Sequence, residues 1–461
     1  MLQALLAVVI CGGLQAAPAE VSPRTNVVFI MTDDQGIWSL GCYGHAEPHT
    51  PGVDRLAAEG VRFTQAFATT PVCSPSRATF FTGRIPSQHG IHDWIKHENM
   101  GERARYCLVG ETLISEVLAE HGYTCGMVGK WHLGDSLGPH AAYSYWFAML
   151  QGSGPYQNSD MIWNGQVIKT TGYATDRITD HAVEFLELNR DKPFFLNVSY
   201  GAPHSPWRDH PQELVDLYKD CKFDSIPKLP THPWSAFDVE RLRNHEILSQ
   251  YFAACSGVSR GVERIMATLD TLRLTEKTLV IYTSDQGFCV GHHGLWSKGN
   301  ASNPRNMYDT SLRIPLIWRQ PGRLPQGTSS EVLFSAYDFV PTLLAYLGLP
   351  PSPGRNLPGQ SFAKALEGQA QKTPDAVFGE YGRTRMIRTR NLKYVHRADG
   401  GPHELYDLEK DPGETDNLAD RPEHRSRLIA LRSRLFDWFE RYGEAGRDPV
   451  GQEYLRPADK E

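Results

Sequence analysis

Four short apolar runs, each followed at once by charged or polar residues, limit the folds open to this 461-residue chain. Such a run is typical of a strand buried on both faces of a parallel sheet. The runs are Thr25–Thr32, Tyr123–Val128, Pro193–Tyr200 and Thr278–Thr283, and helical periodicity lies between them at Glu111–Glu120, Thr175–Asn189 and Ser249–Leu272. The alternation predicts an α/β domain with a large doubly wound sheet, mixed but mostly parallel, flanked by helices.

The N-terminus predicts the compartment. An apolar run, Leu2–Ile10, is followed by small residues up to Ala19, which indicates a cleaved signal peptide over residues 1–19; a frayed terminus is the alternative. No later stretch has the roughly 20 apolar residues that span a bilayer, so we expect no membrane span and a secreted or periplasmic protein. Seven cysteines then remain, and if Cys73 is set aside the other six could form up to three disulfides, whose pairing the sequence leaves open.

The chain changes character after Gly348–Gly354. Beyond it, four short strands and one helix are predicted, which indicates a small antiparallel sheet covered by a helix. The strands are Ala376–Tyr381, Arg385–Thr389, Leu392–His396 and Glu404–Leu408, and the helix runs from about Arg421 to Tyr442. We therefore expect an N-terminal α/β domain over residues 22–349 and a C-terminal α+β subdomain over residues 355–461.

The charge balance excludes one class of partner. There are 47 Lys and Arg residues against 53 Asp and Glu residues, a formal net charge of -6. Such a chain offers no broad positive surface for phosphate backbones, so we expect no nucleic-acid partner.

Polar residues follow the predicted strands where parallel strands place ligand sites, beyond their carboxyl ends. Asp33-Asp34 follows the first strand and Asp285-Gln286 the last. Three carboxylates and an amide oxygen suit a hard cation such as Ca²⁺, although adjacent aspartates can also simply cap turns. Cys73 stands just before Pro75 in a short predicted helix that Gly83 closes, a position that favours an anionic group.

Cys73-Ser74-Pro75-Ser76-Arg77, with the downstream Thr82-Gly83-Arg84, resembles the motif of the type I sulfatases, in which the cysteine is converted to formylglycine (3-oxoalanine). The resemblance covers nearly the whole chain and implies an arylsulfatase-like sulfuric ester hydrolase of the alkaline phosphatase superfamily, with that superfamily's fold. Further matching segments are Asp33-Asp34, Gly129–Gly134, Pro203–Pro206, Thr283–Gly287, Lys298 and Glu404–Leu408.

The resemblance implies a metal site and a nucleophile. Asp33, Asp34, Asp285 and Gln286 would hold one Ca²⁺, with the hydrated aldehyde made from Cys73 as a further ligand. One hydroxyl of this geminal diol would attack sulfur, and the second would later lose its proton so that the aldehyde reforms and sulfate leaves. Gln286 departs from the Asn of many relatives but keeps the amide oxygen. Maturation would require a formylglycine-generating enzyme as a partner.

The resemblance also implies roles for the neighbouring side chains. Asp285 would take the proton of the attacking hydroxyl, and His132 would deprotonate the second one. Arg77 and Lys130 would hold the diol. Lys298 and His204 would bind the sulfate oxygens and assist the leaving alcohol. Taken singly, these lysines and histidines could equally be ordinary solvated or structural residues.

Substrate signals are weaker. Trp94 and His97 follow the Cys73 helix, and Trp207 and Arg208 follow His204, so all four are candidate contacts for a sulfated sugar. The alternative is that both tryptophans pack in the core. Two other functions stay open: a formylglycine-dependent phosphonate monoester or phosphodiester hydrolase, and a non-catalytic binder of sulfated glycans that keeps Cys73 as a thiol.

Overall fold

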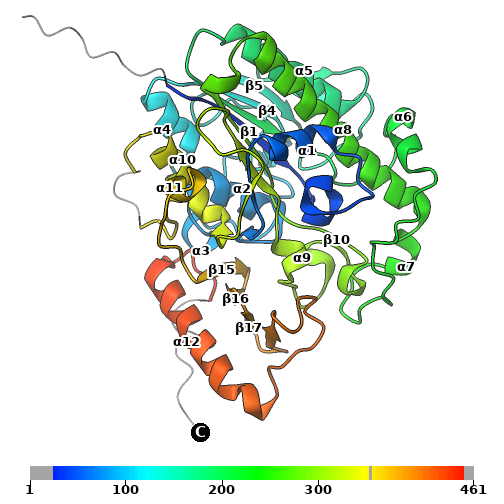
Figure 1. Cartoon of the computed structure of the whole chain (residues 1–461), viewed down its shortest axis with the longest axis vertical. Coiled ribbons are helices and arrows are strands. Elements are labelled where there is room, and N and C mark those ends of the chain that lie inside the picture. Colours follow the sequence, from blue (N-terminus) through cyan, green and yellow to red (C-terminus); the bar gives the residue numbers. More distant parts are fainter. Residues whose placement is uncertain (1–23, 352–355, 451–461) are drawn as a thin grey trace, which may run out of the picture.

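A ten-stranded sheet forms the centre of the computed structural model, which describes residues 24–351 and 356–450 (Figure 1). The four predicted strands are neighbours in this sheet and run parallel to one another. In sheet order they are β9 (Thr278–Ser284), β1 (Asn26–Thr32), β8 (Phe194–Ser199) and β4 (Thr124–Gly129). The predicted signal peptide lies outside the described residues.

The register brings the carboxyl ends of these four strands to one level. Thr32 pairs with Ser284, Met31 with Ser199, and Ser199 with Gly129. The residues that follow each strand therefore meet at the same sheet edge. The outer strands are β13 (Thr328–Ser330), β2 (Val61–Phe63) and β12 (Leu316–Arg319) beyond β9, and β5 (Tyr143–Met149), β6 (Asp160–Trp163) and β7 (Gln166–Lys169) beyond β4. Antiparallel pairing of β12 with β9 makes the sheet mixed, as predicted.

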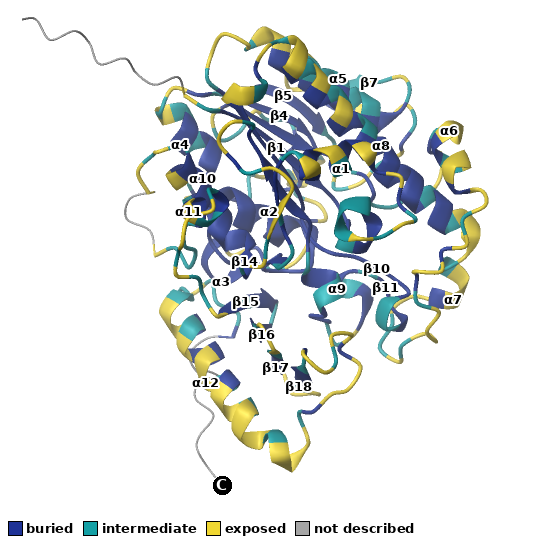
Figure 2. Cartoon of the chain, viewed as in Figure 1, coloured by how far each residue is buried: buried dark blue, intermediate teal, exposed yellow. Residues whose placement is uncertain are grey.

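Helices cover both faces of the sheet because its central strands are apolar on both sides (Figure 2). Val27, Phe29 and Met31 pack in one hydrophobic cluster, and Val28 and Ile30 in another. Helices α2 (Cys73–Thr82), α4 (Ile114–Glu120) and α10 (Phe339–Tyr346) contribute to the first cluster; α1 (Pro51–Ala58), α5 (Ala174–Leu188) and α8 (His245–Thr271) contribute to the second.

In the α/β part, two predicted helix starts differ from the observed ones by three residues or more. Helix α4 begins at Ile114, not Glu111, since the Glu116 carboxylate accepts the backbone N–H of Leu113 at 2.7 Å and caps the helix there. Helix α8 begins at His245, not Ser249, because the Asn244 side chain accepts the N–H of Ile247 at 3.0 Å. In both cases the capping hydrogen bond, and not the first apolar residue of the pattern, determines where the helix begins.

A four-stranded antiparallel sheet and helix α12 (Arg425–Tyr442) form the C-terminal part, as predicted. Its strands are β15 (Ala376–Tyr381), β16 (Thr384–Thr389), β17 (Leu392–Arg397) and β18 (Glu404–Asp407). Leu431 and Leu435 of α12 pack with Ile387 and Leu405 of the sheet. Strand β15 also contacts the segment before α2, because Glu380 N–H donates to the Thr69 carbonyl at 2.9 Å.

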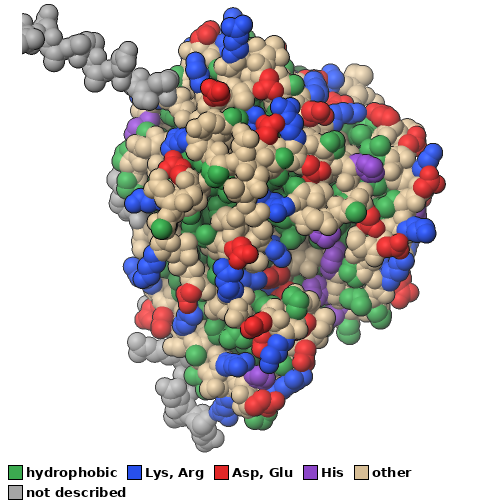
Figure 3. Space-filling view, viewed as in Figure 1, with side chains coloured by type: hydrophobic (Ala, Val, Ile, Leu, Met, Phe, Trp, Pro, Cys, Tyr) green, Lys and Arg blue, Asp and Glu red, His purple; other side chains and the backbone are tan. Residues whose placement is uncertain are grey.

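The remaining elements are short. They are the helices α3 (Pro86–His89), α6 (Gln212–Val215), α7 (Val239–Leu242), α9 (Asp309–Leu312) and α11 (Ala363–Leu366), and the strands β3 (Ala66–Phe67), β10 (Cys289–Val290), β11 (Trp296–Ser297) and β14 (Phe334–Ser335). On the face shown in Figure 3, basic and acidic side chains are interspersed. Within residues 24–351 and 356–450, no helix is both long and apolar enough to cross a membrane.

The disulfides that the sequence allowed do not form among the described cysteines, all of which are free. Cys125, Cys255 and Cys289 lie in three different hydrophobic clusters. The seven described cysteines are thus free thiols, four of them buried and three partly exposed, and form no bridge framework.

Candidate active site

Asp33-Asp34 and Asp285-Gln286 lie at the ends of β1 and β9, held by the backbone that continues each strand. Asp285 N–H donates to the Thr32 carbonyl at 3.0 Å, and Asp34 N–H donates to Asp285 Oδ1 at 3.3 Å. Asp34 has a φ of 64°, a left-handed conformation that aspartate tolerates better than most residues, and its carbonyl accepts the Tyr251 hydroxyl at 2.7 Å. These contacts hold the carboxylates of Asp34 and Asp285 beside Asp33.

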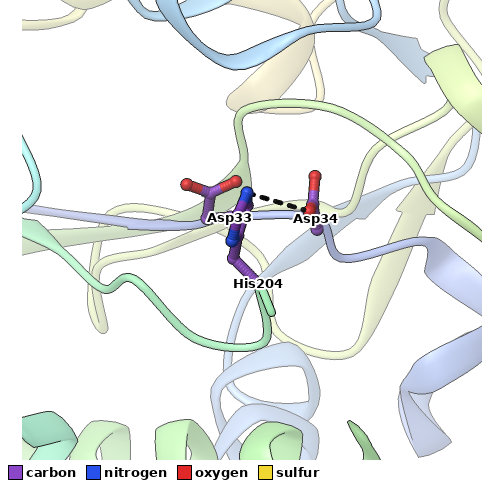
Figure 4. Close-up of side chains that lie close together, drawn as sticks. All are labelled: Asp33, Asp34 and His204. Atoms are coloured by element: carbon purple, nitrogen blue, oxygen red, sulfur yellow. Dashed lines mark ion pairs between the residues drawn. The ribbon is translucent and has the colours of Figure 1, made fainter. Parts of the chain in front are cut away.

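Asp33, Asp34 and His204 bring ligand atoms within 4.8 Å of one another (Figure 4). His204 comes from the segment after β8, and its Nε2 lies 3.7 Å from Asp34 Oδ2. The Gln286 amide nitrogen donates to Asp34 at 2.5 Å and to Asp33 at 3.4 Å. Its Oε1 is buried and accepts no hydrogen bond from the described residues.

This donor set fits a hard cation. Because amide oxygen and nitrogen are interchangeable by a half-turn of the side chain, Gln286 can present Oε1 toward Asp33 and Asp34. A cation there would satisfy the orphaned oxygen and replace the amide as the partner of both carboxylates. Asp285 is less free, since Arg77 lies 2.9 Å from its Oδ2.

Three cationic side chains lie against these carboxylates. Arg77, on α2, lies 3.4 Å from Asp33 and donates to the Lys130 carbonyl at 3.0 Å. Lys130, directly after β4, pairs with Asp33. Lys298 pairs with Asp34 at 2.6 Å. All of these side chains are buried, so each charge depends on its partners to offset desolvation.

The pKa values follow from this packing. Burial alone would raise the pKa of Asp33, but the charges of Lys130, His204 and Lys298 outweigh it and hold the pKa far below its usual range. Burial and the charge of Asp33 raise the pKa of Asp285. Burial would lower the pKa of Lys298, but Asp34 outweighs it and raises that pKa. Asp285 therefore takes up a proton more readily than Asp33.

Cys73 is the first residue of α2, and the helix ends at Gly83 with a φ of 72°, as the sequence predicts. The thiol is buried, which raises its pKa, and Lys130 and Lys298 are near enough to oppose that shift. The side chain thus lies at a buried helix N-terminus beside two cations, a setting that favours an anion.

The two predicted histidines have defined tautomers. His132 Nε2 lies 2.9 Å from the Ile95 carbonyl, which can only accept, so Nε2 carries the proton. Its Nδ1 is buried with no hydrogen bond to the described residues, and burial together with Lys130 lowers the pKa well below its usual value. His204 Nδ1 likewise faces the Ser205 carbonyl at 2.9 Å, which leaves Nε2 toward Asp34.

The chain matches two family models, one described as sulfatase over residues 25–349 and one as N-sulphoglucosamine sulphohydrolase, C-terminal, over residues 291–440. The chain belongs to the sulfatase family. It is therefore an enzyme that hydrolyses sulfate esters, and the resemblance seen in the sequence is confirmed.

Individual sulfatases match over most of their length. An uncharacterized sulfatase, YidJ, of Escherichia coli is 31% identical, covering 95% of this chain and 91% of that protein. An N-acetylglucosamine-6-O-sulfatase of Bacteroides thetaiotaomicron is 27% identical, covering 92% and 88%. A solved structure described in complex with its substrate D-glucosamine-2-N,6-O-disulfate matches with a TM-score of 0.77 and 25% identity, covering 92% of this chain and 99% of that one.

The predicted substrate residues of this sulfatase lie in different surroundings. Trp94 is 39% exposed, with Lys96 Nζ 4.8 Å from its ring centroid, and His97 is exposed. Trp207 packs edge-on against Phe288 and Trp296 at 5.9 and 5.4 Å between ring centroids, so it also has a packing role. The Arg208 side chain is 76% exposed.

Three further residues, Gly152, Tyr156 and Tyr381, border the site and were not predicted from the sequence. Gly152 lies so close to the His132 ring that a Cβ there would clash at 2.3 Å, and the Tyr156 hydroxyl donates to the His204 carbonyl at 2.7 Å. Tyr381, the last residue of β15, belongs to the same hydrophobic cluster as Cys73. Only Tyr381 had a sequence signal, as the end of a predicted strand.

Proposed function

We propose that the protein is a secreted or periplasmic, calcium-dependent sulfatase that acts on a sulfated carbohydrate through a formylglycine hydrate derived from Cys73. The observation that carries the proposal is the position of Cys73 at the N-terminus of a buried helix, beside Lys130, Lys298, Asp33 and Asp285. In this proposal residues 22–349 form the catalytic domain and residues 355–461 the small subdomain.

Asp33, Asp34, Asp285 and Gln286 are the residues that would hold Ca²⁺. Support comes from the orphaned Oε1 of Gln286 and from the close approach of the Asp33 and Asp34 oxygens. When bound, the ion would favour the ionised form of a nucleophilic hydroxyl and so supply nucleophile at neutral pH. His204 is not one of the metal ligands in this scheme, so its Nε2 stays available for the substrate.

The chain's own residues would orient the reacting groups and move protons. Arg77 bridges Asp33 and Asp285 and, with Lys130, would hold the hydrate made from Cys73. Burial raises the pKa of Asp285, so this carboxylate would accept the proton of the attacking hydroxyl. Each of these groups is already held by a buried contact, so little reorganisation would be needed on substrate binding.

His132 would act as the base that removes the second hydroxyl proton. Its Nδ1 has a free lone pair, since Nε2 is occupied by the Ile95 carbonyl. Lys298 would bind sulfate oxygens, and His204 Nε2 would assist the leaving alcohol.

The sugar preference rests on the relative whose structure is described in complex with D-glucosamine-2-N,6-O-disulfate, and on four side chains that adjoin the site residues in sequence. Trp94 and His97 would contact the sugar on one side, and Trp207 and Arg208 on the other. An aromatic face and basic groups suit a sulfated ring.

The test is release of inorganic sulfate from a panel of sulfated saccharides and one aryl sulfate, using protein co-expressed with a formylglycine-generating enzyme. The Cys73→Ala variant serves as the matched control. Release by the parent alone is the expected result. Faster turnover of matched phosphodiesters or phosphonate monoesters would favour the related hydrolase instead, and a peptide mass showing only unmodified Cys73 in natively expressed protein would favour a non-catalytic glycan binder.

A further inference from the structure

Three side chains from distant parts of the chain meet next to the Cys73 site. The Tyr381 hydroxyl, at the end of β15, donates to Asp93 Oδ1 at 2.7 Å. Arg305, between Lys298 and α9, lies 3.4 Å from Asp93 Oδ2, and its guanidinium carbon is 4.9 Å from the Tyr381 ring centroid. These three residues are called the Asp93 cluster below.

One hydrogen bond and one packing contact connect the Asp93 cluster to the active site. Two residues after Asp93, Ile95 N–H donates to Ser74 Oγ at 3.1 Å, and Ser74 follows Cys73. On the other side, the Tyr381 ring rests against Gly299, the neighbour of Lys298, where an added Cβ would come within 2.9 Å of the ring. The cluster therefore borders both the nucleophile position and a sulfate-binding lysine.

The Asp93 cluster is preorganised by its internal contacts, yet two of its three side chains are accessible to a ligand. Tyr381 is 2% exposed, whereas the side chains of Asp93 and Arg305 are 45% and 40% exposed. The Arg305 carbonyl accepts from Arg397 at 3.1 Å, which fixes that segment.

The chemistry of the cluster suits hydroxyl groups. Burial and Asp93 raise the pKa of Tyr381, so its hydroxyl stays neutral and donates to Asp93 Oδ1. Asp93 Oδ2 lies 3.4 Å from Arg305, so it can still accept a further hydrogen bond from a ligand. A carboxylate accepts from a sugar hydroxyl, and a guanidinium donates to a sugar oxygen, so the pair can bind two neighbouring oxygens of one ring.

We propose that Asp93 and Arg305 bind oxygens of the sulfated sugar next to the sulfate ester, and that Tyr381 is a positioning residue that orients Asp93. This inference rests on the proposed sulfatase function and adds to it the residues that select the sugar. An aryl sulfate has no such hydroxyl and cannot use this interaction.

The experiment compares three substrates: the sulfated monosaccharide that the parent hydrolyses best, its analogue lacking the hydroxyl next to the sulfated carbon, and an aryl sulfate. For Asp93→Asn, we expect the ratio of kcat/KM for the sugar to kcat/KM for the aryl sulfate to fall about 10- to 100-fold, as for loss of a hydrogen bond to a charged group. The deoxy analogue should show little further loss in Asp93→Asn, because its hydroxyl is already missing. Tyr381→Phe should lower the same ratio by a smaller factor.

Glu331→Gln is the matched control, since Glu331 forms an exposed ion pair with Arg390 at 3.1 Å. It should leave the ratio as in the parent. Thermal unfolding of each variant separates misfolding from lost selectivity. An unchanged ratio in Asp93→Asn, or an equal loss on sugar and aryl sulfate, overturns this inference while leaving the sulfatase function intact. A matured parent that releases sulfate from no saccharide of the panel and from no aryl sulfate overturns both.

Discussion

Phe29 links the central strand to the helix that carries Cys73, and replacing it tests that packing. Its side chain is fully buried on β1, four residues before Asp33, with the rings of Phe339, Phe80 and Phe81 at 4.6, 5.9 and 6.3 Å between centroids. Phe80 and Phe81 belong to α2. The position of Cys73 relative to Asp33 thus depends on this aromatic contact.

Phe29→Ala should destabilise the fold by about 3–5 kcal/mol, because it removes a buried ring and leaves a cavity among three others. Phe29→Leu keeps most of the volume and should cost less than about 1.5 kcal/mol. At about 2 °C per kcal/mol, the low end for larger domains, the alanine variant should lose about 6–10 °C in Tm.

Thermal unfolding followed by circular dichroism measures both variants, with Phe237→Ala as the control, since Phe237 is 42% exposed. The control should shift stability by no more than about 0.5 kcal/mol. A cost below about 1.5 kcal/mol for Phe29→Ala, or equal losses for leucine and alanine, would show that the Phe29 ring does not hold β1 and α2 together.

Three further predictions concern the site and the fold. Cys73→Ala should abolish sulfate release without lowering Tm by more than about 5 °C; substantial remaining turnover would contradict the proposed nucleophile. Asp33→Asn should weaken Ca²⁺ binding about tenfold or more, measured by calorimetry, because it removes one charged ligand. Burial raises the pKa of Asp338 to about 8 from 3.8, so the folded state favours its protonated form and stability is lost as pH rises from about 4 to about 8; Asp338→Asn should flatten the fall in Tm over this range.

The strands and the strand-end residues were predictable because their signals are local. An apolar run followed by Asp33-Asp34 or Asp285-Gln286 marks both a buried strand and its polar end within a few residues. Likewise, Pro75 and Gly83 mark the two ends of the helix that begins at Cys73. These local signals suffice to predict the site because parallel strands place their carboxyl ends at one edge of the sheet, whatever segments connect the strands.

Long-range pairing was not predictable in the same way. Tyr381 and Asp93 are 288 residues apart, and no periodicity links them. Glu111, assigned by its pattern to a helix, instead pairs with Arg84 at 3.0 Å. The absence of disulfides among the described cysteines was unpredictable for the same reason, because a cysteine count does not tell which thiols are neighbours in the fold.

The charges at the sheet edge lead to a last prediction. The formal charges of Asp33, Asp34 and Asp285 are cancelled by those of Arg77, Lys130 and Lys298, and all six side chains are buried. A bound Ca²⁺ would therefore leave an excess of two positive charges in a setting that water screens poorly.

A sulfate anion offsets that excess, so Ca²⁺ and inorganic sulfate should each strengthen the binding of the other, by about 5-fold or more. Calorimetric titration of Ca²⁺ with and without sulfate measures the coupling, and the reverse titration must give the same factor because linkage is reciprocal. Raised ionic strength from a chloride salt is the control, since a buried coupling should survive it while a surface effect would be screened. Independent binding of the two ions would show that the buried charges are not balanced as the geometry indicates.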